Sequence, residues 1–236
     1  MKYIALVGAC PTEAKKKLTS LPMIEEVITL PPDTLVDSPI SSHPDTVLCI
    51  FDNKLYCHDE YAKQNSELLD HICKQSGLSL CSQSGERSGK YPYDTAFNAL
   101  PLHGMQKVVG RKCSLCAPLA NACINVNQGY AACAALALLD GSVITADNSI
   151  KKALSREGIP VHTVSGKDIL LHGYDKGFIG GCGGVFENTL CIFGDCSSAT
   201  GQELQKICSS TSLSLISLCS GPLTDYGGVK FVKLPQ

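Results

Sequence analysis

Charge is scarce in this sequence. Only 18% of the 236 residues are Asp, Glu, Lys or Arg, below the usual value of about 25%, and 44% are hydrophobic. This balance favours a compact, strand-rich globular protein over a disordered one, and the chain is long enough to bury a sizeable core. The net charge is −2 and no basic run exceeds Lys15–Lys17, so charge gives no indication of nucleic acid binding.

Long apolar runs are also missing. No stretch approaches the roughly 18 apolar residues that a membrane-spanning helix needs. Residues 1–11 contain a short apolar run, but Pro11 and the charged segment behind it match a signal peptide poorly. We therefore expect a cytoplasmic protein with no membrane partner.

The fourteen cysteines fall below the share of about 8–10% that marks a disulfide scaffold. Several lie in apolar runs, where a reduced thiol packs as a small hydrophobe. Cys113 and Cys116 have metal-like spacing, but Cys123 alone does not complete a zinc site with four ligands. A structural role is favoured for this pair. No metal or cofactor is indicated, and a reducing cytoplasm is the simplest interpretation.

One stretch, Lys176–Asp195, is unusually rich in glycine. It contains four glycines interrupted only by Cys182, followed by a strand, a turn at Glu187 and Asn188, and a second strand. The stretch lacks the Lys-Ser/Thr ending of a phosphate-binding P-loop. A backbone this bare usually lies close to another strand or to a ligand.

The order strand, strand, helix, strand recurs along the chain. In the clearest unit, Asp140 and Gly141 form a hairpin turn, Asp147 or Asn148 caps a helix, and Gly158 ends it. Three units are regular. The first has expected strands at Thr46–Phe51, Leu55–Cys57 and Leu78–Cys81, with a helix from Asp59 to Gln75. The second has strands at Ala134–Leu139, Ser142–Thr145 and Ile159–Val164, and the third at Gly184–Phe186, Thr189–Gly194 and Leu213–Leu218.

Two units are less regular. One covers Asp94–Asn127, with strands at Thr95–Leu102 and Lys107–Val109 and a helical segment interrupted by Pro118. The other is split between the termini, with strands expected at Asp225–Leu234 and Met1–Gly8, a helix near Pro11–Ser20 and a strand at Glu26–Leu30.

The units start at intervals of about 47 residues, which favours five repeats in one closed ring. We therefore predict a single α/β domain over residues 1–236, an α/β propeller whose split unit closes the ring and covers an edge strand. A doubly wound sheet is the alternative, but its strands should alternate singly with helices. The approximate units are 45–90, 91–128, 129–165, 166–220, and 221–236 joined with 1–44.

Four segments carry a family resemblance: Ser42–Asp45, Gln128–Cys133, Gly177–Gly181 and Pro222–Gly227. They resemble an uncharacterised bacterial family with the pentein fold, and the resemblance covers nearly the whole chain. Five such units in a pseudo-fivefold arrangement are shared by arginine deiminase, agmatine deiminase, dimethylarginine dimethylaminohydrolase and a non-catalytic ribosome anti-association factor. The resemblance implies the same fold for this chain.

The resemblance also argues against ordinary arginine-type deiminase activity. The segment Tyr93–Ala96 is similar to the motif that carries a guanidinium-binding aspartate, which implies that role for Asp94. Two further segments resemble those that carry the catalytic histidine and the catalytic cysteine of these enzymes. Here Phe178 replaces the histidine and Phe231 replaces the cysteine. Whether the protein is an enzyme therefore stays open.

In this fold the first strands converge on an axial pocket, so the resemblance implies that residues at the unit starts share one site. Three aspartates facing one lysine would favour a guanidino or amino compound, or less readily a divalent cation. Aspartates before strands also often bond turn N–H groups, a reading as well supported as ligand binding. The ligand-binding candidates are Asp45, Asp94, Asn98, Gln128, Tyr130, Asp225 and Lys230.

The catalytic candidates are His43, Cys133 and Cys182. His43 is the best-placed proton carrier. Cys133 enters an alanine-rich apolar strand and reads as a core residue, whereas Cys182 between glycines is expected to be accessible. Three functions remain: a pocket for a small cation, a divergent cysteine-dependent guanidine or amidine hydrolase or transferase, and a non-catalytic interaction protein. We expect a monomer or homodimer.

Overall fold

A computed structural model describes residues 1–84 and 88–235. Within this part of the chain the strands form five separate three-stranded sheets, which contradicts the alternative of one doubly wound sheet. Each sheet contains one antiparallel and one parallel pairing. The predicted unit 45–90 is followed as far as Ser84, because residues 85–87 lie outside the described residues.

The first complete unit matches its predicted order. It consists of β3 (Leu48–Phe51), β4 (Lys54–His58), α3 (Asp59–Gln64), α4 (Ser66–Ser76) and β5 (Ser79–Gln83). The predicted single helix is divided at Asn65. Gly77, with φ +73°, ends α4 in the left-handed conformation that glycine adopts at little cost.

The next unit is the least regular, as the sequence indicates. It consists of β6 (Leu100–Pro101), β7 (Val108–Gly110), α5 (Ala117–Asn121) and β8 (Cys123–Asn125). The strand predicted over Thr95–Leu102 is mostly wrong, because the 3-10 turn η2 (Tyr93–Thr95) and a loop occupy its first half.

The two units that follow are regular. One contains β9 (Ala135–Ala137), β10 (Val143–Thr145), α7 (Asn148–Arg156) and β11 (Val161–Thr163). The predicted cap is confirmed, because Asp147 accepts hydrogen bonds from the N–H groups of Ser149 and Ile150. The other contains β12 (Gly183–Phe186), β13 (Thr189–Phe193), α8 (Ala199–Thr211) and β14 (Ser214–Cys219).

The split unit also forms as predicted. The C-terminal β15 (Val229–Lys233) pairs antiparallel with β1 (Tyr3–Val7), which pairs in parallel with β2 (Ile24–Thr29). Helix α1 (Thr12–Thr19) connects β1 to β2. The 3-10 turn η1 (Ser38–Ile40) leads towards the next unit.

A short helical turn precedes three of the first strands, which corrects two predictions. The turns are α2 (Pro44–Val47), α6 (Ala131–Ala134) and η3 (Gly180–Cys182). Strands predicted to start at Thr46 and Ala134 therefore start later, at Leu48 and Ala135. Proline at the first position favours the turn of α2, and alanine has the highest helix propensity.

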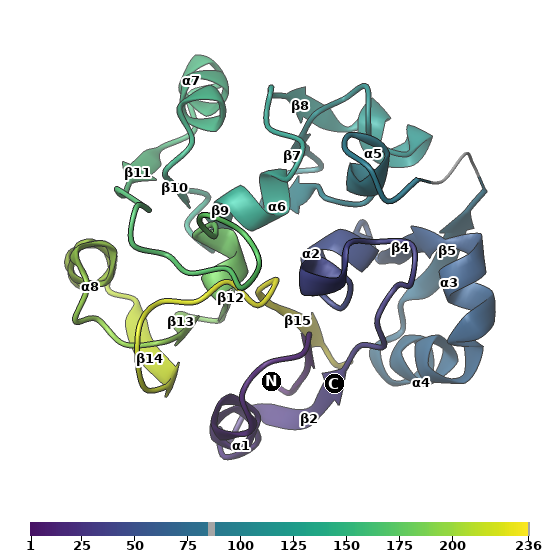
Figure 1. The fold of residues 1–236 in the computed structure, drawn as a ribbon, viewed down its shortest axis with the longest axis horizontal. Coiled ribbons are helices and arrows are strands. Elements are labelled where there is room, and N and C mark those ends of the chain that lie inside the picture. Colours follow the sequence, from purple (N-terminus) through teal and green to yellow (C-terminus); the bar gives the residue numbers. More distant parts are fainter. Residues whose placement is uncertain (85–87, 236) are drawn as a thin grey trace.

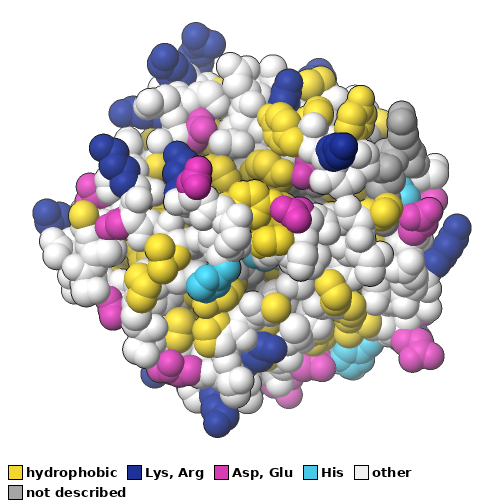
Figure 2. All heavy atoms as spheres, in the orientation of Figure 1, with side chains coloured by type: hydrophobic (Ala, Val, Ile, Leu, Met, Phe, Trp, Pro, Cys, Tyr) yellow, Lys and Arg dark blue, Asp and Glu magenta, His cyan; other side chains and the backbone are white. Residues whose placement is uncertain are grey.

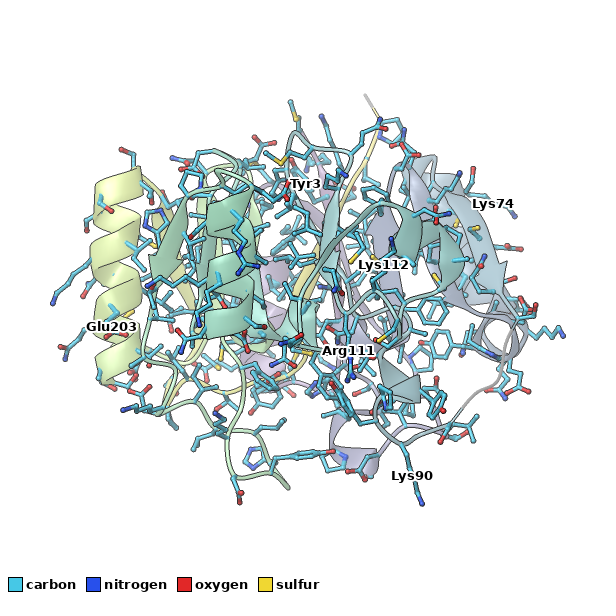
Figure 3. All side chains as sticks on the ribbon, turned by 90° about the horizontal axis from the view of Figure 1, so that it is seen from above. Tyr3, Lys74, Lys90, Arg111, Lys112 and Glu203 are labelled. Carbon is cyan, nitrogen blue, oxygen red and sulfur yellow. The ribbon has the colours of Figure 1, made fainter. Side chains whose placement is uncertain are left out.

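The sheets surround the middle of the molecule, and their first strands face it (Figure 1). These strands contact one another in chain order: β3 with β6, β6 with β9, β9 with β12, and β12 with β15. Seen from above, helix α8 with Glu203 lies on the outside (Figure 3).

Five hydrophobic clusters form the core, and each combines residues of two neighbouring sheets. For example, Leu6 of β1 and Leu55 of β4 share one cluster, whereas Phe193 of β13 lies with Tyr3 of β1 in another. Each sheet therefore depends on both neighbours for its buried surface.

The outer surface is mixed in character. On the face of Figure 2, apolar and some acidic side chains lie near the middle, and most Lys and Arg side chains lie at the rim. Within residues 1–84 and 88–235, no helix combines the length and apolar character needed to cross a membrane.

Candidate ligand-binding site

A cavity of about 330 Å³ lies where the chain enters the first strands. We call it the acidic cavity. Four predicted site residues line it: His43 at the start of α2, Tyr130 and Cys133 at α6, and Asp225 in the loop before β15. Its remaining lining residues are Ile40, Thr46, Leu171, Tyr174, Asp175, Lys176 and Phe178.

The Asp225 carboxylate is fixed by the backbone of the glycine-rich stretch and of its own loop. One oxygen accepts from Phe178 N at 2.9 Å and the other from Gly227 N at 2.9 Å. A Cβ on Gly181 would lie 1.8 Å from Asp225 Oδ1, and one on Gly227 would lie 2.3 Å from His43 Cβ. The glycines therefore allow the carboxylate and the imidazole to approach this backbone.

Asp225 and His43 line the cavity, and Asp45 is buried close to both of them. His43 Nδ1 lies 3.7 Å from Asp225 Oδ1. Burial, together with the nearby Asp45 carboxylate, raises the pKa of Asp225 although two N–H groups oppose this effect. Burial lowers the pKa of His43, which Asp45 opposes. The imidazole of His43 is therefore held in its neutral form, and the carboxyl group of Asp225 keeps its proton to a higher pH than an ordinary aspartate.

Asp45 is almost completely buried, with 1% of its surface exposed. Oδ1 accepts a long hydrogen bond from Thr46 Oγ1 at 3.4 Å, whereas Oδ2 has no hydrogen-bond partner among the described residues. A buried carboxylate oxygen without a donor is costly, because it has lost its water without replacement. The Cys133 thiol interacts with the Asp45 carboxylate, but an S–H group is only a weak donor, so a strong donor is missing.

Asp94 has the same incomplete bonding. Its Oδ2 accepts from the hydroxyl of Tyr130 at 2.5 Å, and its buried Oδ1 has no partner within the described residues. Burial raises the pKa of Asp94. Tyr130 lies between Tyr91 and Phe178, with ring centroids 5.7 and 6.4 Å away. Asp94 is thus joined through Tyr130 to an aromatic wall of the acidic cavity.

The Cys133 thiol lines the cavity but is not activated. Its Sγ accepts from Asn98 Nδ2 at 3.1 Å, and Asn98 Oδ1 accepts from Ala132 N at 2.8 Å. Burial first, and then Asp45 and Asp225, raise the pKa of Cys133 well above the ordinary value. The thiol is therefore protonated at neutral pH. Asn98 has no exposed surface, and its two hydrogen bonds hold Cys133 and α6 in place.

The prediction that Cys182 is accessible is wrong. Its side chain has no exposed surface and packs with Leu190 and Ile192, and its Sγ donates to Phe178 O at 3.3 Å. Burial raises its pKa well above the ordinary value. The neighbouring glycines admit other backbone segments instead of solvent, since a Cβ on Gly180 would lie 2.3 Å from Ala132 O.

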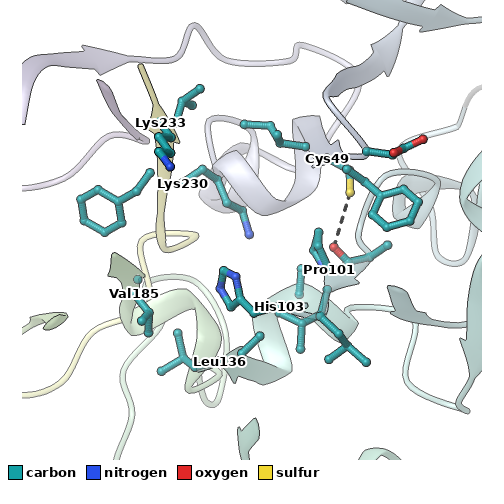
Figure 4. Close-up of a pocket in the computed structure, with 18 of the residues that line it drawn as sticks. Cys49, Pro101, His103, Leu136, Val185, Lys230 and Lys233 are labelled. Atoms are coloured by element: carbon teal, nitrogen blue, oxygen red, sulfur yellow. Dashed lines mark hydrogen bonds between the residues drawn. The ribbon is translucent and has the colours of Figure 1, made fainter. Parts of the chain in front are cut away.

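Two further candidates lie away from the acidic cavity. Gln128 donates to Asp147 at 3.1 Å and accepts from Tyr130 N at 3.1 Å, so it connects α7 to the start of α6. Lys230 lines a second, larger cavity that runs along the first strands (Figure 4). The lysine that the sequence placed among the aspartates thus faces a different space.

Sequence reasoning missed the part of the acidic cavity that lies at the start of the glycine-rich stretch. Tyr174, Asp175 and Lys176 line the cavity, and Tyr174 donates to Asp37 at 2.5 Å. Three consecutive polar or aromatic residues before four glycines were the available signal. Their position depends on the packing of this loop against η1, where a Cβ on Gly173 would lie 2.7 Å from Pro39 Cγ.

No group of three or more His, Cys, Asp or Glu side chains within the described residues is arranged to hold a metal ion. Cys113 is exposed and Cys116 is half-buried.

The fold and the two cavities define an α/β protein of five small sheets, with carboxylates buried where its first strands begin. The chain belongs to a family of unknown function, DUF6873, whose model matches residues 7–230. No curated protein matches the sequence.

Proposed function

We propose that this protein binds a small organic cation, carrying a guanidinium or an amino group, in the acidic cavity. The observation that supports this most directly is a pair of buried carboxylate oxygens next to the cavity that lack hydrogen-bond donors within the described residues. They are Asp45 Oδ2, beside the lining residue Thr46, and Asp94 Oδ1, on the carboxylate that bonds the lining residue Tyr130. A guanidinium or ammonium group supplies N–H donors and a compensating charge at once.

The rest of the cavity suits such a ligand. Its volume of about 330 Å³ is at the lower end of the range for small-molecule sites, which is about 300–1,000 Å³. The aromatic side chains of Tyr130 and Phe178 line the cavity and add contact area for the body of the ligand. Asp225 is held by backbone N–H groups, so it needs little reorganisation when a cation enters.

We further propose that the five units form the pseudo-fivefold propeller of the pentein fold. Support comes from the unit order, from the contacts between successive first strands, and from core clusters shared by neighbouring sheets. The pairing of β1 with β15 supplies the connection that a closed ring requires.

The test is a binding screen by thermal unfolding and calorimetry with arginine, agmatine, putrescine and other guanidino and amino compounds. A ligand that binds only the folded state raises the unfolding midpoint. We expect Asp45→Asn to weaken the binding of any hit at least tenfold, and Asp70→Asn, an exposed control on α4, to leave it unchanged. The absence of any hit, or equal binding by both variants, would refute the proposal.

A second candidate function is cysteine-dependent turnover of a guanidine or amidine, because the Cys133 thiol and His43 line the same cavity. The thiol must lose its proton before it can attack carbon, and the two carboxylates disfavour this loss. Iodoacetamide labelling tests the idea: a bound cation should speed alkylation of Cys133 relative to the other thirteen cysteines. Unchanged labelling together with binding would leave a binding protein only.

A further inference from the structure

The second cavity has a volume of about 910 Å³ and is lined by residues of the first strands of all five sheets. We call it the lysine cavity. Lys230 extends into it from β15, and the imidazole of His103 faces Lys230 from the opposite wall (Figure 4). Pro101, Leu136 and Val185 contribute apolar surface around them.

The backbone of Lys230 is held from two sides. On one side it pairs with Leu6 in the ladder between β15 and β1. On the other, β12 approaches so closely that a Cβ on Gly184 would lie 2.2 Å from Val229 O. A charged side chain on so rigid a base is already oriented towards the cavity, so little ordering is required when a ligand binds.

The ammonium group of Lys230 has no counter-ion in the described structure. No ion pair or hydrogen bond joins it to another described residue. The Cys49 thiol lies close enough for the ammonium to lower its pKa, but burial outweighs this and raises it to about 12, so the thiol stays neutral. Of the acidic residues that the structure describes, only Asp52 lines the cavity, and it is exposed on the β3–β4 turn.

The charge of the lysine cavity is therefore positive, with Lys230 and Lys233 against Asp52, and His103 as a further donor. A half-buried ammonium without a partner attracts an anion more strongly than a fully solvated one, because the surrounding protein screens the charge less than water does. Apolar walls beside it add contact area for the rest of a ligand.

We propose that the lysine cavity binds an organic anion. Its carboxylate or phosphate group contacts Lys230 and His103, and its apolar body lies along Pro101, Leu136 and Val185. This site is separate from the acidic cavity and does not depend on the function proposed for it.

The test uses the full chain and the fluorescent anion anilinonaphthalene sulfonate. We expect saturable binding to the folded protein, at least tenfold weaker in Lys230→Met, retained in Lys230→Arg, and unchanged in Lys54→Met, an exposed control on β4 outside the cavity. The arginine variant keeps the charge, so it also serves as the folded comparison if the methionine variant fails to fold.

Competition separates the two head groups. Displacement of the dye by octanoate identifies a carboxylate with an apolar body, and displacement by inorganic phosphate identifies a phosphate site; either result upholds the proposal. The proposal would be overturned by dye binding of equal strength in Lys230→Met and wild type, by loss of dye binding in Lys230→Arg, or by displacement with neither competitor.

Discussion

The acidic cavity is lined by turns and loops that precede first strands, whereas the lysine cavity is lined by the first strands themselves, and the two differ in charge. Within the described residues, carboxylate oxygens without donors lie beside the former, and the latter contains an ammonium without an acceptor. In the acidic cavity the charges come from the turns before the strands, whereas Lys230 comes from within β15. The backbone of the glycine-rich stretch lies between the two, with Phe178 lining one cavity and Gly183 the other.

This difference shows how one framework can separate charges of opposite sign. Had Lys230 reached Asp225, the two would have neutralised each other, and neither cavity would attract a charged ligand. Instead Asp225 lines one cavity and Lys230 the other, and no ion pair joins the two in the described structure. The predictions below test how independent the two cavities are.

The largest effect is expected for Gly181→Ala. The new Cβ would lie 1.8 Å from Asp225 Oδ1, and Gly181 O accepts from Tyr226 N and Gly228 N, so the whole loop must shift. We expect a loss of about 2–4 kcal/mol in the free energy of unfolding, measured by urea titration, and loss of cation binding.

The matched control for that substitution is Gly110→Ala, whose Cβ would meet only the flexible end of Leu115 at 2.8 Å. We expect a smaller loss of stability and intact cation binding. Anion binding should survive in any folded fraction of Gly181→Ala. If the two substitutions cost the same, the close approach at Asp225 is not what requires glycine.

A second effect concerns pH. The folded-state pKa of Asp225 is raised, so its contribution to stability is present below the ordinary pKa of about 3.9 and is lost as pH rises through the folded value. The pKa of His43 is lowered in the folded state, so its contribution to the free energy of unfolding is present above the ordinary pKa of about 6.5 and is lost as pH falls below it. Subtracting the curve of Asp225→Asn from that of wild type isolates the carboxyl group.

We expect this difference in unfolding free energy to fall as pH rises from about 4 towards neutrality, with a slope of at most about 1.4 kcal/mol per pH unit. Chemical denaturation at a series of pH values measures it. A difference that stays constant, or that rises with pH, would show that Asp225 is not protonated more readily in the folded state.

A third prediction compares the effects of one substitution at each cavity on the binding of both ligands. Asp45→Asn should weaken cation binding at least tenfold and change anion binding less than twofold, and Lys230→Met should do the reverse. Charged hydrogen bonds contribute about 1.5–3 kcal/mol each, which corresponds to these ratios. Calorimetry with one ligand of each sign measures all four affinities, and cross-effects of tenfold would contradict separate cavities.

The smallest effect should appear at two cysteines. Lys230 lowers the pKa of Cys49 and Asp45 raises that of Cys133, within an overall increase that burial causes in both. Iodoacetamide should therefore label Cys49 several-fold more slowly in Lys230→Met and Cys133 several-fold faster in Asp45→Asn. Peptide mass spectrometry at mildly alkaline pH reports both rates, and changes of the same sign would count against the assigned charges.

Much of the fold could be predicted from the sequence, because its signals are local. Asp147 caps α7, Gly77 ends α4, and the turn at Asp140 and Gly141 joins β9 to β10. The split unit also followed from order alone. The α2 and α6 turns were missed, since four helical residues give too short a pattern to distinguish from the start of a strand.

The candidate site was predictable in part. His43, Asp45, Cys133 and Asp225 do come together, because each precedes a first strand. The burial of Cys182 and the direction of Lys230 depend on packing between units that are distant in sequence, such as β12 against β15. No local pattern carries that information.

The pairing of the terminal strands has a mechanical consequence. Leu234 N donates to Lys2 O, and the antiparallel ladder continues from Tyr3 and Lys233 to Val7 and Val229, so both free ends leave at the same end of the ladder. Tension applied between residues 2 and 234 loads one rung at a time, as in a zipper, and does not shear all rungs together. Pulled by its ends, this protein would open at its seam under low force, before the other four sheets bear load.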